Sequence, residues 1–574
     1  MPLPLEISSA PQDRVLRQLV AATLFEGLVP FRIEPLDRLT WTSGGHQYRC
    51  RATLGTFGRP RIHPHSIEMK SDGNWVPASL LAIVTGLPGN GITRDKLLRE
   101  LEHTVTLCQW NEDNIPPRDR RDMAFAELDG ALHEGHPYHP CFKARYGFTI
   151  EDNLRFGPES AKPFQLFWAL HARDTIRQAL DRDETSFWKS ELGEDVWNKI
   201  DDARQAKSLD WNDFALVPMH PWQWQRLRDG AGSDLIARGK LHGLGHFGDR
   251  YLASQSLRSL HNLDRPLAAS IKLPLDVVNT SSRRTLDPHS VCTAPILSRW
   301  IAGMVGEDAA FRDRYPLTIL QEYAAVLAEH DGDLSGQIGA IWRETALKDL
   351  LPGEEVIPFN ALMMLEADEK PFVHPWIERF GLMPWLNRLL EISILPVWHL
   401  LVHHGLAVEA HGQNMLLVHR DGWPVRLVLR DFHESVEFCP FFLRHPAKAP
   451  DFPSLDARYR DAPPNQYYWM DNLDSLRELV ADTLFVYNLA EVAHLLDHVY
   501  QLPEASFWQR VEALLETYAA SNGASQRMAA LGYNAATIQT ESLLTRKLLA
   551  REPEYHHDVP NFFTKATAER RTMR

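Results

Sequence analysis

Cysteine is scarce in this sequence, and the few cysteines present are not arranged in pairs. Five are scattered over 574 residues, and no two of them form a CxxC motif. An odd, dispersed set argues against a disulfide framework and against a cysteine zinc site. The cysteine usage therefore suits a reducing compartment, and we expect a cytoplasmic protein.

Long hydrophobic runs, low-complexity segments and internal repeats are also missing. The first residues, MPLPLEISSAPQDRVL, contain no basic segment followed by an apolar one, so we expect no secretion signal. The most apolar long stretch, 389–410, contains Glu391, Pro396 and three histidines. Such a stretch suits a buried helix better than a membrane span, and we expect no membrane partner.

Basic residues are in deficit, because 61 lysines and arginines face 75 acidic residues and leave a formal charge of −14. A general nucleic-acid surface is therefore not expected. Hydrophobic residues make up 44% and charged residues 24%, which is ordinary for a globular protein. At this length the chain is too long for a single core, and several domain-sized units are expected.

Hydrophobic spacing predicts a mixed α+β fold. We expect a helix over 11–28, short strands over 32–59, and two alternating strands over 251–260 and 267–278. Further helices are predicted over 164–179, 317–329, 338–348 and 384–404, and a closing helical bundle over 475–500, 506–520 and 537–549.

A β-hairpin is predicted within EAHGQNMLLVHRDGWPVRLVLRDF, residues 409–432. Asp421 and Gly422 stand between two apolar β-prone runs, a strong signal for a two-residue hairpin loop. With that loop Asn414 faces Leu429. Asn414 and Asp431 then become diagonal neighbours on one face, about 7–8 Å apart.

The mouth of this hairpin is a candidate magnesium site. An amide oxygen from Asn414 and a carboxylate from Asp431 are hard-oxygen ligands of the kind that Mg²⁺ takes beside nucleotide phosphates. Glu409 and His411 lie just upstream. The alternative is a surface hairpin with an ordinary polar end.

A histidine-rich loop covers residues 133–148. Its histidines recur every third residue, which is compatible with zinc, but the intervening prolines break the helical face that would align them. An anion-binding loop fits the residue types better, with cations beside imidazole donors. Local hydrogen bonding within the loop is the third reading. The candidate anion ligands are His136, His139, Lys143 and Arg145.

Hydroxyls and cations accompany the two strands predicted over 251–260 and 267–278. A lysine inside an apolar strand, as Lys272 is, costs free energy unless its ammonium meets an anion. We read this group as a phosphate-binding site, and the alternative is a set of solvated strand edges. Its members are Ser256, Arg258, Ser259, Lys272 and Arg284.

Taken together, these segments resemble a known family, the NRPS-independent siderophore synthetases or IucA/IucC-like family. Each fragment is weak, but they occur in the family's order. The matching fragments are GHPYHPCFKARYGF (135–148), MHPWQW (219–224), SQSLRSL (254–260), KLPL (272–275), TSSRRTL (280–286), EAHGQN (409–414) and RDF (430–432).

The resemblance implies a cupped-hand architecture and an ATP-dependent ligase. The thumb, the β-rich fingers and the helical palm would cover residues 1–155, 156–350 and 351–574. Such an enzyme adenylates citrate or a citrate derivative, and an amine or alcohol then captures the acyl group. The acid could instead be 2-oxoglutarate or a succinyl or monoamide intermediate. Family members often dimerise, so a homodimer is possible.

Carried over residue by residue, the resemblance assigns roles to specific side chains. Ser259 departs from the threonine usual in the family, which keeps the hydroxyl and loses a methyl group. The implied catalytic residues are Arg258, Lys272 and His411. The implied ATP ligands are His136, His139, Lys143, Ser256, Arg258, Ser259, Lys272, Arg284, His411 and Asn414, and the Mg²⁺ ligands are Glu409, Asn414 and Asp431.

A polycarboxylic substrate needs cations of its own, and Arg145, Arg343 and Arg546 are candidates for that role. Two other classes of function compete with the ligase. One is a kinase-like phosphotransferase, which would release ADP where a ligase releases AMP. The other is a non-enzymatic carboxylate- or metal-binding protein that uses the histidine-rich loop.

Overall fold

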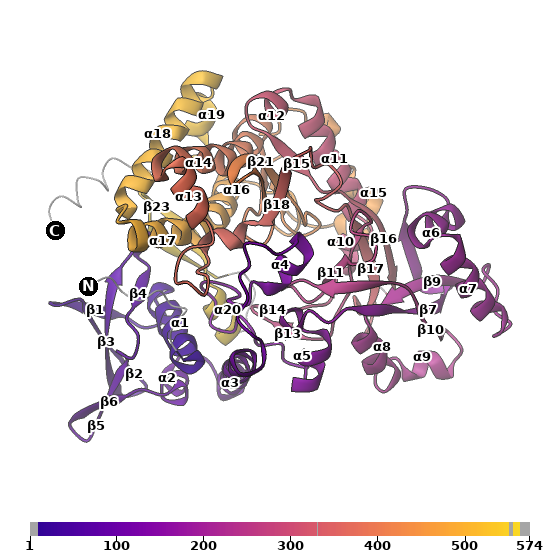
Figure 1. The fold of residues 1–574 in the computed structure, drawn as a ribbon, viewed down its shortest axis with the longest axis horizontal. Coiled ribbons are helices and arrows are strands. Elements are labelled where there is room, and N and C mark those ends of the chain that lie inside the picture. Colours follow the sequence, from indigo (N-terminus) through magenta and orange to yellow (C-terminus); the bar gives the residue numbers. More distant parts are fainter. Residues whose placement is uncertain (1–9, 330, 550–554, 563–574) are drawn as a thin grey trace.

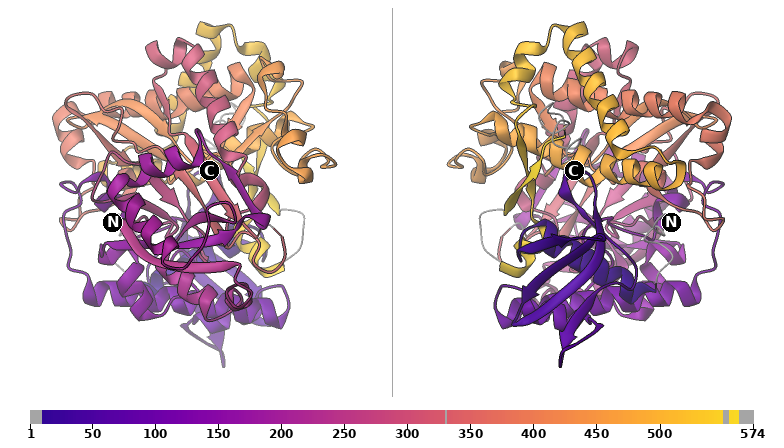
Figure 2. Two further views of the ribbon diagram at one scale, coloured as in Figure 1. Left: turned by 90° about the vertical axis from the view of Figure 1, so that its right-hand side faces the viewer. Right: turned by 90° about the vertical axis from the view of Figure 1, so that its left-hand side faces the viewer.

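The computed structural model describes residues 10–329, 331–549 and 555–562, and it has the predicted α+β character. Figure 1 shows an N-terminal sheet in indigo, a larger sheet in magenta, and C-terminal helices in orange and yellow. The side views place the indigo strands below the yellow helices (Figure 2). We describe the fold as three bodies: the N-terminal sheet with its helices, the larger middle sheet, and the C-terminal helices with a small sheet.

The N-terminal body pairs a small sheet with helices. Helix α1 (Pro11–Phe25) confirms the predicted first helix, and it buries Val15, Leu19 and Val20. The sheet has the order β1-β2-β3-β5-β6, with β4 paired to β3. Its strands are β1 (Phe31–Glu34), β2 (Arg38–Ser43), β3 (His46–Leu54), β4 (Pro60–Ile62), β5 (Glu68–Ser71) and β6 (Asn74–Pro77), and helices α2 (Leu80–Gly86), α3 (Gly91–Asn114), α4 (Phe125–Ala131) and α5 (Ile150–Phe156) follow.

The middle body is an antiparallel sheet with the order β8-β16-β17-β12-β11-β10-β7-β9. Its strands are β7 (Phe164–Ala172), β8 (Ile176–Ala179), β9 (Phe214–Met219), β10 (Leu241–Ala253), β11 (Ser259–Asn262), β12 (Ser270–Lys272), β16 (Glu322–Ala328) and β17 (Ile338–Arg343). Helices α6 (Glu184–Leu192), α7 (Glu194–Gln205) and α8 (Pro221–Arg228) pack beside it. The central position of β11 and β12 carries the predicted phosphate-binding residues into the interior.

Three predicted helices are strands in the structure. The segments 164–179, 317–329 and 338–348 contribute β7 and β8, β15 and β16, and β17. All of β17 and nearly all of β16 are buried. A strand that is buried on both faces shows no polar alternation, so periodicity alone cannot separate it from a buried helix. The helix predictions over 317–329 and 338–348 failed for that reason.

The C-terminal body combines a small sheet with a helical bundle. The sheet has the order β15-β21-β20-β18, from β15 (Leu317–Ile319), β18 (Glu354–Pro358), β20 (Met415–Arg420) and β21 (Trp423–Leu429). Two short strands, β19 (Leu406–Val408) and β22 (Val436–Phe438), pair separately. The helices are α13 (His374–Phe380), α14 (Leu382–His399), the π-helix η6 (Leu400–His404), α16 (Leu473–Val480), the π-helix η9 (Ala481–Leu489), α17 (Ala490–Tyr500), α18 (Glu504–Asn522), α19 (Ser525–Ala530) and α20 (Leu543–Leu549).

The closing bundle is confirmed except at its end. Residues 537–549 are not one helix, because strand β23 (Thr537–Glu541) precedes α20 and pairs with β24 (His556–Pro560). Among the described residues, one helix, Leu473–Tyr500, is long and apolar enough to cross a membrane. Of its most apolar window 78% is buried, so this helix packs within the core.

The hydrophobic core joins the first and last bodies. One cluster contains Val15 and Leu19 of α1 together with Leu389 of α14 and Leu484 of η9, whereas the large sheet has a cluster of its own. Strand β15 lies before residue 350 yet pairs with β21 of the last body. The division at residues 155 and 350 remains a prediction, and the core does not follow it strictly.

Candidate active site

A turn between β10 and β11 brings hydroxyls and a cation together. The predicted continuous strand over 251–260 is broken, because β10 ends at Ala253 and β11 begins at Ser259. Leu257 adopts a φ of 67°, which reverses the chain in the left-handed region. The Ser259 amide donates a 3.1 Å hydrogen bond to the Ser256 hydroxyl. The turn therefore holds Ser256 and Ser259 side by side, with Arg258 between them in sequence.

Strand pairing adds the buried lysine to this group. The second predicted strand is shorter than 267–278, since β12 covers only Ser270–Lys272. In the antiparallel ladder Ser259 lies opposite Lys272, and directly opposed side chains are about 4.5–5.5 Å apart at Cβ. The Leu273 amide donates to the Arg258 carbonyl at 2.8 Å. Two neighbouring strands thus explain why these predicted residues meet.

The cations at this place crowd one another. Burial lowers the pKa of Lys272, and Arg258 lowers it further against the opposing effect of Asp431. Burial and then Arg258 lower the pKa of Arg284 to about 9. The Nε atom of Arg284 is buried without a hydrogen-bond partner in the described part of the chain. Among the described residues, Arg284 therefore lies beside another cation without a carboxylate in ion-pair contact.

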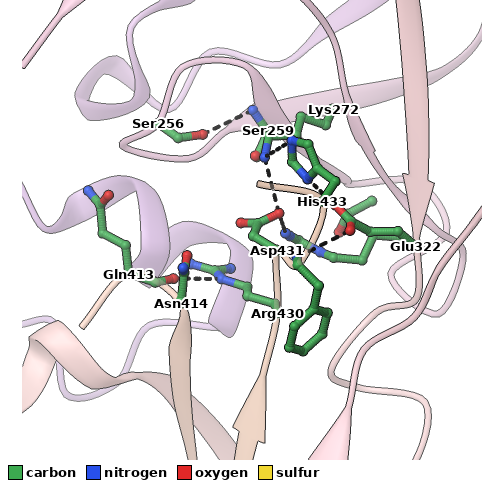
Figure 3. Close-up of polar contacts among 12 residues, drawn as sticks. Ser256, Ser259, Lys272, Glu322, Gln413, Asn414, Arg430, Asp431 and His433 are labelled. Atoms are coloured by element: carbon green, nitrogen blue, oxygen red, sulfur yellow. Dashed lines mark hydrogen bonds and ion pairs between the residues drawn. The ribbon is translucent and has the colours of Figure 1, made fainter. Parts of the chain in front are cut away.

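Asp431 is the carboxylate that approaches these cations. Its Oδ1 accepts from Arg343 at 2.6 Å and from Lys272 at 3.4 Å (Figure 3). Burial alone would raise the pKa of Asp431, but Arg343, Lys272 and Arg430 hold it well below its ordinary value. Both close contacts use the same oxygen. Oδ2 is therefore the atom from which Asp431 can approach a ligand.

Three acidic or imidazole groups beside Asp431 were missed in the sequence. His433 Nδ1 lies 2.8 Å from Glu322 Oε1, and His433 Nε2 lies 3.3 Å from Lys272 Nζ. Glu434 accepts from Ser290 Oγ at 3.1 Å and lines the same space. His433 and Glu434 directly follow the RDF fragment, so their position was a usable signal. Glu322 had none, because its strand read as a helix.

The hairpin at Asp421 and Gly422 is confirmed, with one correction of register. Arg420 faces Trp423 as expected, but the pairing shifts by one residue between Val418 and His419. Met415 therefore faces Leu429, and the Asn414 carbonyl instead accepts from the Arg430 amide at 3.0 Å. A β-bulge of this kind is invisible to a count of residues from the turn.

The loop before the hairpin presents oxygen atoms and an imidazole to the same space. Glu409 Oε2 accepts from the Ser435 hydroxyl at 2.5 Å, and Glu409 Oε1 lies 3.6 Å from His411 Nε2. Asn414 Nδ2 donates to the Glu409 carbonyl at 3.1 Å, which leaves the amide oxygen of Asn414 to face a ligand. Glu409, Asn414 and Asp431 thus line the same cleft, and their role as Mg²⁺ ligands stays a prediction.

The histidine-rich loop divides into a part that reaches the site and a part that does not. His136 lines the cleft, and its Nδ1 accepts from the amides of Tyr138 and His139, each at 3.1 Å. Burial, then His411 and Arg59, lower the pKa of His136 to about 3. His139 is fully buried, and its Nδ1 accepts from the Cys141 amide at 3.0 Å. Backbone contacts therefore hold both rings, which argues against zinc.

Lys143 and Arg145 correct a prediction, because both already form ion pairs with a buried carboxylate. Lys143 Nζ lies 2.5 Å and Arg145 Nη2 2.7 Å from the same oxygen of Glu159. Both side chains are about 1% exposed. Burial would raise the pKa of Glu159, but Arg145 and Lys143 hold it well below its ordinary value. This buried triad binds the loop to the start of the large sheet instead of facing a ligand.

Carboxylates gather at the opposite end of the space. Burial, then Glu541, Glu409 and Glu478, raise the pKa of Asp482 well above its ordinary value. Arg546, predicted to contact substrate, lies here and forms an ion pair with Glu541. Asp558 on β24 belongs to the same wall. Negatively charged groups therefore lie close together here, as positively charged groups do around β11 and β12.

All these groups surround one cleft of about 1620 Å³. Single-ligand pockets are typically about 300–1,000 Å³, so the cleft has room for more than one ligand. The predicted residues that line it are His136, Ser256, Arg258, Ser259, Lys272, Arg284, Glu409, His411, Asn414, Asp431 and Arg546. Four predicted residues, His139, Lys143, Arg145 and Arg343, lie behind its wall.

Two family models match the chain. The IucA / IucC family model matches residues 124–364, and a second model, described as a ferric iron reductase FhuF-like transporter, matches residues 383–570. The first covers β11 and β12, and the second covers the hairpin. Both halves of the cleft therefore lie within matched segments.

Named relatives and solved structures match nearly the whole chain. A citryl-spermidine/3,4-dihydroxybenzoyl-citryl-spermidine:spermidine ligase from Bacillus anthracis is 34% identical and covers 96% of this chain and 92% of its own. The petrobactin biosynthesis protein AsbB from the same species superimposes with a TM-score of 0.92 at 31% identity, over 99% and 98% of the two chains. Aerobactin synthetase IucC from Klebsiella pneumoniae gives 0.81 at 26%, over 97% and 98%.

Proposed function

The chain belongs to the IucA/IucC family of siderophore synthetases, and from that premise we propose which ligands occupy each part of its cleft. It is a ligase that joins a citrate-derived acid to an amine in siderophore biosynthesis, as its named relatives do. We propose that ATP activates the acid as an acyl-adenylate. The amine then displaces AMP.

The proposed chemistry has two steps. A carboxylate oxygen of the acid attacks the α-phosphorus of ATP, and the bond from that phosphorus to pyrophosphate breaks. The amine nitrogen then attacks the acyl carbon, the bond to AMP breaks, and the nitrogen loses a proton. A free carboxylate is a poor electrophile, and conversion to a mixed anhydride supplies the leaving group that amide formation needs.

The observation that carries this proposal is the crowding of cations around β11 and β12. The first step brings an anionic carboxylate to an anionic phosphate, and positive charge must offset that repulsion in a partly dry site. Lys272, Arg258 and Arg284 supply it, and the lowered pKa of Arg284 reflects the absence of a full protein counter-charge. Ser256 and Ser259 add hydroxyl donors to phosphate oxygens at the same turn.

We assign Mg²⁺ to the three oxygen donors Glu409, Asn414 and Asp431. The donor set fits this ion, because two carboxylates and an amide oxygen are hard ligands that leave positions for water and phosphate. When bound, the ion neutralises phosphate charge during transfer. The residues themselves position it: Ser435 orients Glu409, and Arg343 with Lys272 fixes one oxygen of Asp431.

The carboxylate-rich end is proposed to receive the amine. An amine substrate arrives as a cation, so it is drawn to the wall lined by Glu478, Asp482 and Asp558, where burial and neighbouring carboxylates raise the pKa of Asp482. His411 lines the same cleft next to Glu409, where an imidazole is suited to accept a proton from the attacking nitrogen. The cleft volume allows all three ligands at once.

The test is a panel of acids incubated with the protein, ATP, Mg²⁺ and hydroxylamine. Formation of an acyl-hydroxamate with release of AMP from citrate or a citryl amine supports the proposal. Release of ADP in place of AMP would favour the phosphotransferase, and ligand binding without any ATP turnover would favour a binding protein. The matched control is Lys240→Ala, which removes an exposed lysine outside the cleft, beside Lys272→Ala.

A further inference from the structure

A second cluster of possible metal ligands lies away from the cleft. It consists of Asp308, which directly follows α11 (Ala294–Glu307), and three histidines at the end of α14 and η6: His399, His403 and His404. None of the four lines the active-site cleft. We propose that these side chains form a binding site for one divalent transition-metal ion of zinc-like preference.

The helix geometry explains how three histidines reach one point. In an α-helix His399 and His403 share a face, but His404 would turn away from them. Here residues 400–404 form a π-helix, whose i to i+5 spacing returns His404 toward the face of His399. The π-helix ends at Gly405, which has a φ of 80°. A local change of helix type thus assembles the three imidazoles.

The distances from the carboxylate oxygen are compatible with tetrahedral coordination, and all four ligand atoms lie within 4.8 Å of one another. Asp308 Oδ2 lies 3.0 Å from His399 Nε2, 3.7 Å from His403 Nε2 and 3.0 Å from His404 Nε2. Four ligand atoms about 2.0–2.1 Å from a zinc ion lie about 3.3–3.4 Å from one another in a regular tetrahedron. The measured separations bracket that value. Three histidines and one carboxylate are also ligand types that zinc takes.

Hydrogen bonds alone account poorly for this convergence. A single carboxylate oxygen has about two lone-pair directions, so two imidazole donors saturate it. The third imidazole still points at the same oxygen from 3.7 Å.

The surroundings meet two further requirements of a metal site. Second-sphere contacts orient the ligands, because His399 Nδ1 lies 2.7 Å from the Tyr518 hydroxyl and Asp308 Oδ1 accepts from the Ala310 amide at 2.9 Å. An entry path exists, since Asp308, His403 and His404 line a cavity of about 410 Å³. The side chain of His403 is 29% exposed there.

The site would join two parts of the fold. Asp308 lies within the segment matched by the first family model, and the histidines lie within the segment matched by the second. Beyond His404 the chain continues through β19 to Glu409 and His411 of the cleft. An ion held here therefore ties α11 to the element that leads into the active site, and its binding should stabilise the fold.

The experiment measures metal binding directly. The full chain, freed of any polyhistidine tag, is dialysed against Zn²⁺ or Co²⁺ and the bound ion is counted by mass spectrometry. We expect the parent to bind one ion. The Asp308→Asn and His403→Ala variants should each bind that ion at least about tenfold more weakly. The matched control, His445→Ala, removes a histidine that lines the same cavity outside the ligand set. It should bind as the parent does.

Two further readouts separate coordination from a structural effect. Co²⁺ in a tetrahedral site gives visible absorption bands, which both ligand variants should lose while retaining the parent's circular dichroism. Zn²⁺ should raise the melting temperature of the parent and the His445→Ala variant only. The proposal is overturned if the parent binds no ion, or if all four proteins bind alike, as an ion in the active-site cleft would.

Discussion

At the end of the cleft formed by β11 and β12, cations crowd together, whereas at the end formed by α16, η9 and β23 carboxylates crowd together. Arg258 lowers the pKa of Arg284, and Glu541 with Glu409 raises the pKa of Asp482, in each case on top of burial. At each end, burial and like-charged neighbours disfavour the charged form of the side chain. Each is therefore prepared for a ligand of the opposite charge.

The contrast with the rest of the molecule gives this pattern its meaning. Several buried charges outside the cleft form ion pairs, such as Lys143 and Arg145 with Glu159, or Arg430 with Asp129. An ion pair of this kind stabilises the fold, because loss of one partner leaves the other as an uncompensated buried charge. Charged groups that lack an ion-pair partner in a large cleft can instead form a favourable interaction with a ligand of opposite charge. The degree of compensation, more than residue type, separates binding groups from structural ones.

The largest expected effect comes from removing a cation at the first end. Lys272→Ala and Arg258→Ala should each lower the rate of hydroxamate formation by about 10²–10³ or more, because charge at the developing bond is lost. Single-turnover assays with saturating ATP measure this. Lys240→Ala should keep the parent rate, and full activity in both cleft variants would remove these residues from the proposed chemistry.

Neutralising the opposite end should affect the amine and spare the first step. Glu478→Gln combined with Asp482→Asn is expected to raise the KM for a polyamine by about tenfold through lost attraction of a cation. Hydroxylamine, which is uncharged at neutral pH, should still trap the activated acid at the parent rate. Asp313→Asn, an exposed change outside the cleft, is the control. Equal losses with both nucleophiles would contradict the division of the cleft.

The stability of the protein should also report the carboxylate crowding. The pKa of Asp482 is raised in the fold above its ordinary value of 3.8, so between those two values the native state holds a proton that the unfolded chain has lost. Stability therefore falls as pH rises through that interval. The Asp482→Asn variant lacks this titration. The difference between its melting temperature and that of the parent should therefore shift in favour of the variant as pH rises from about 4 to 7. Parallel melting curves for the two proteins would refute the assignment.

The smallest effect is expected for Ser259→Thr, which restores the residue usual in the family. Ser259 is buried opposite Lys272, and the threonine keeps the hydroxyl while adding one methyl group. We expect the rate to stay within about threefold, since a single added methyl is a modest packing change. Steady-state kinetics with ATP as the varied substrate measures it. A loss as large as that of Lys272→Ala would show that the turn tolerates no change.

The sequence predicted the site best where neighbours along the chain carry the signal. The Asp421–Gly422 turn, the α1 and α14 helices, and the hydroxyls and cations around Lys272 were all found from local pattern. Local pattern failed for Glu322, because its strand is buried on both faces and read as a helix. It also failed for the register beyond the hairpin, where one bulge moved Asn414 opposite Arg430.

By itself, the sequence determined the kinds of chemistry available and their order along the chain, since hydroxyl, guanidinium, ammonium and carboxylate groups are properties of single residues and short motifs. Only the tertiary structure decided which charged side chains form ion pairs with one another. Glu159 forms ion pairs with Lys143 and Arg145, whereas Arg258 and Arg284 lie together in the cleft. Electrostatic compensation depends on distance and burial, and residues far apart in sequence set both.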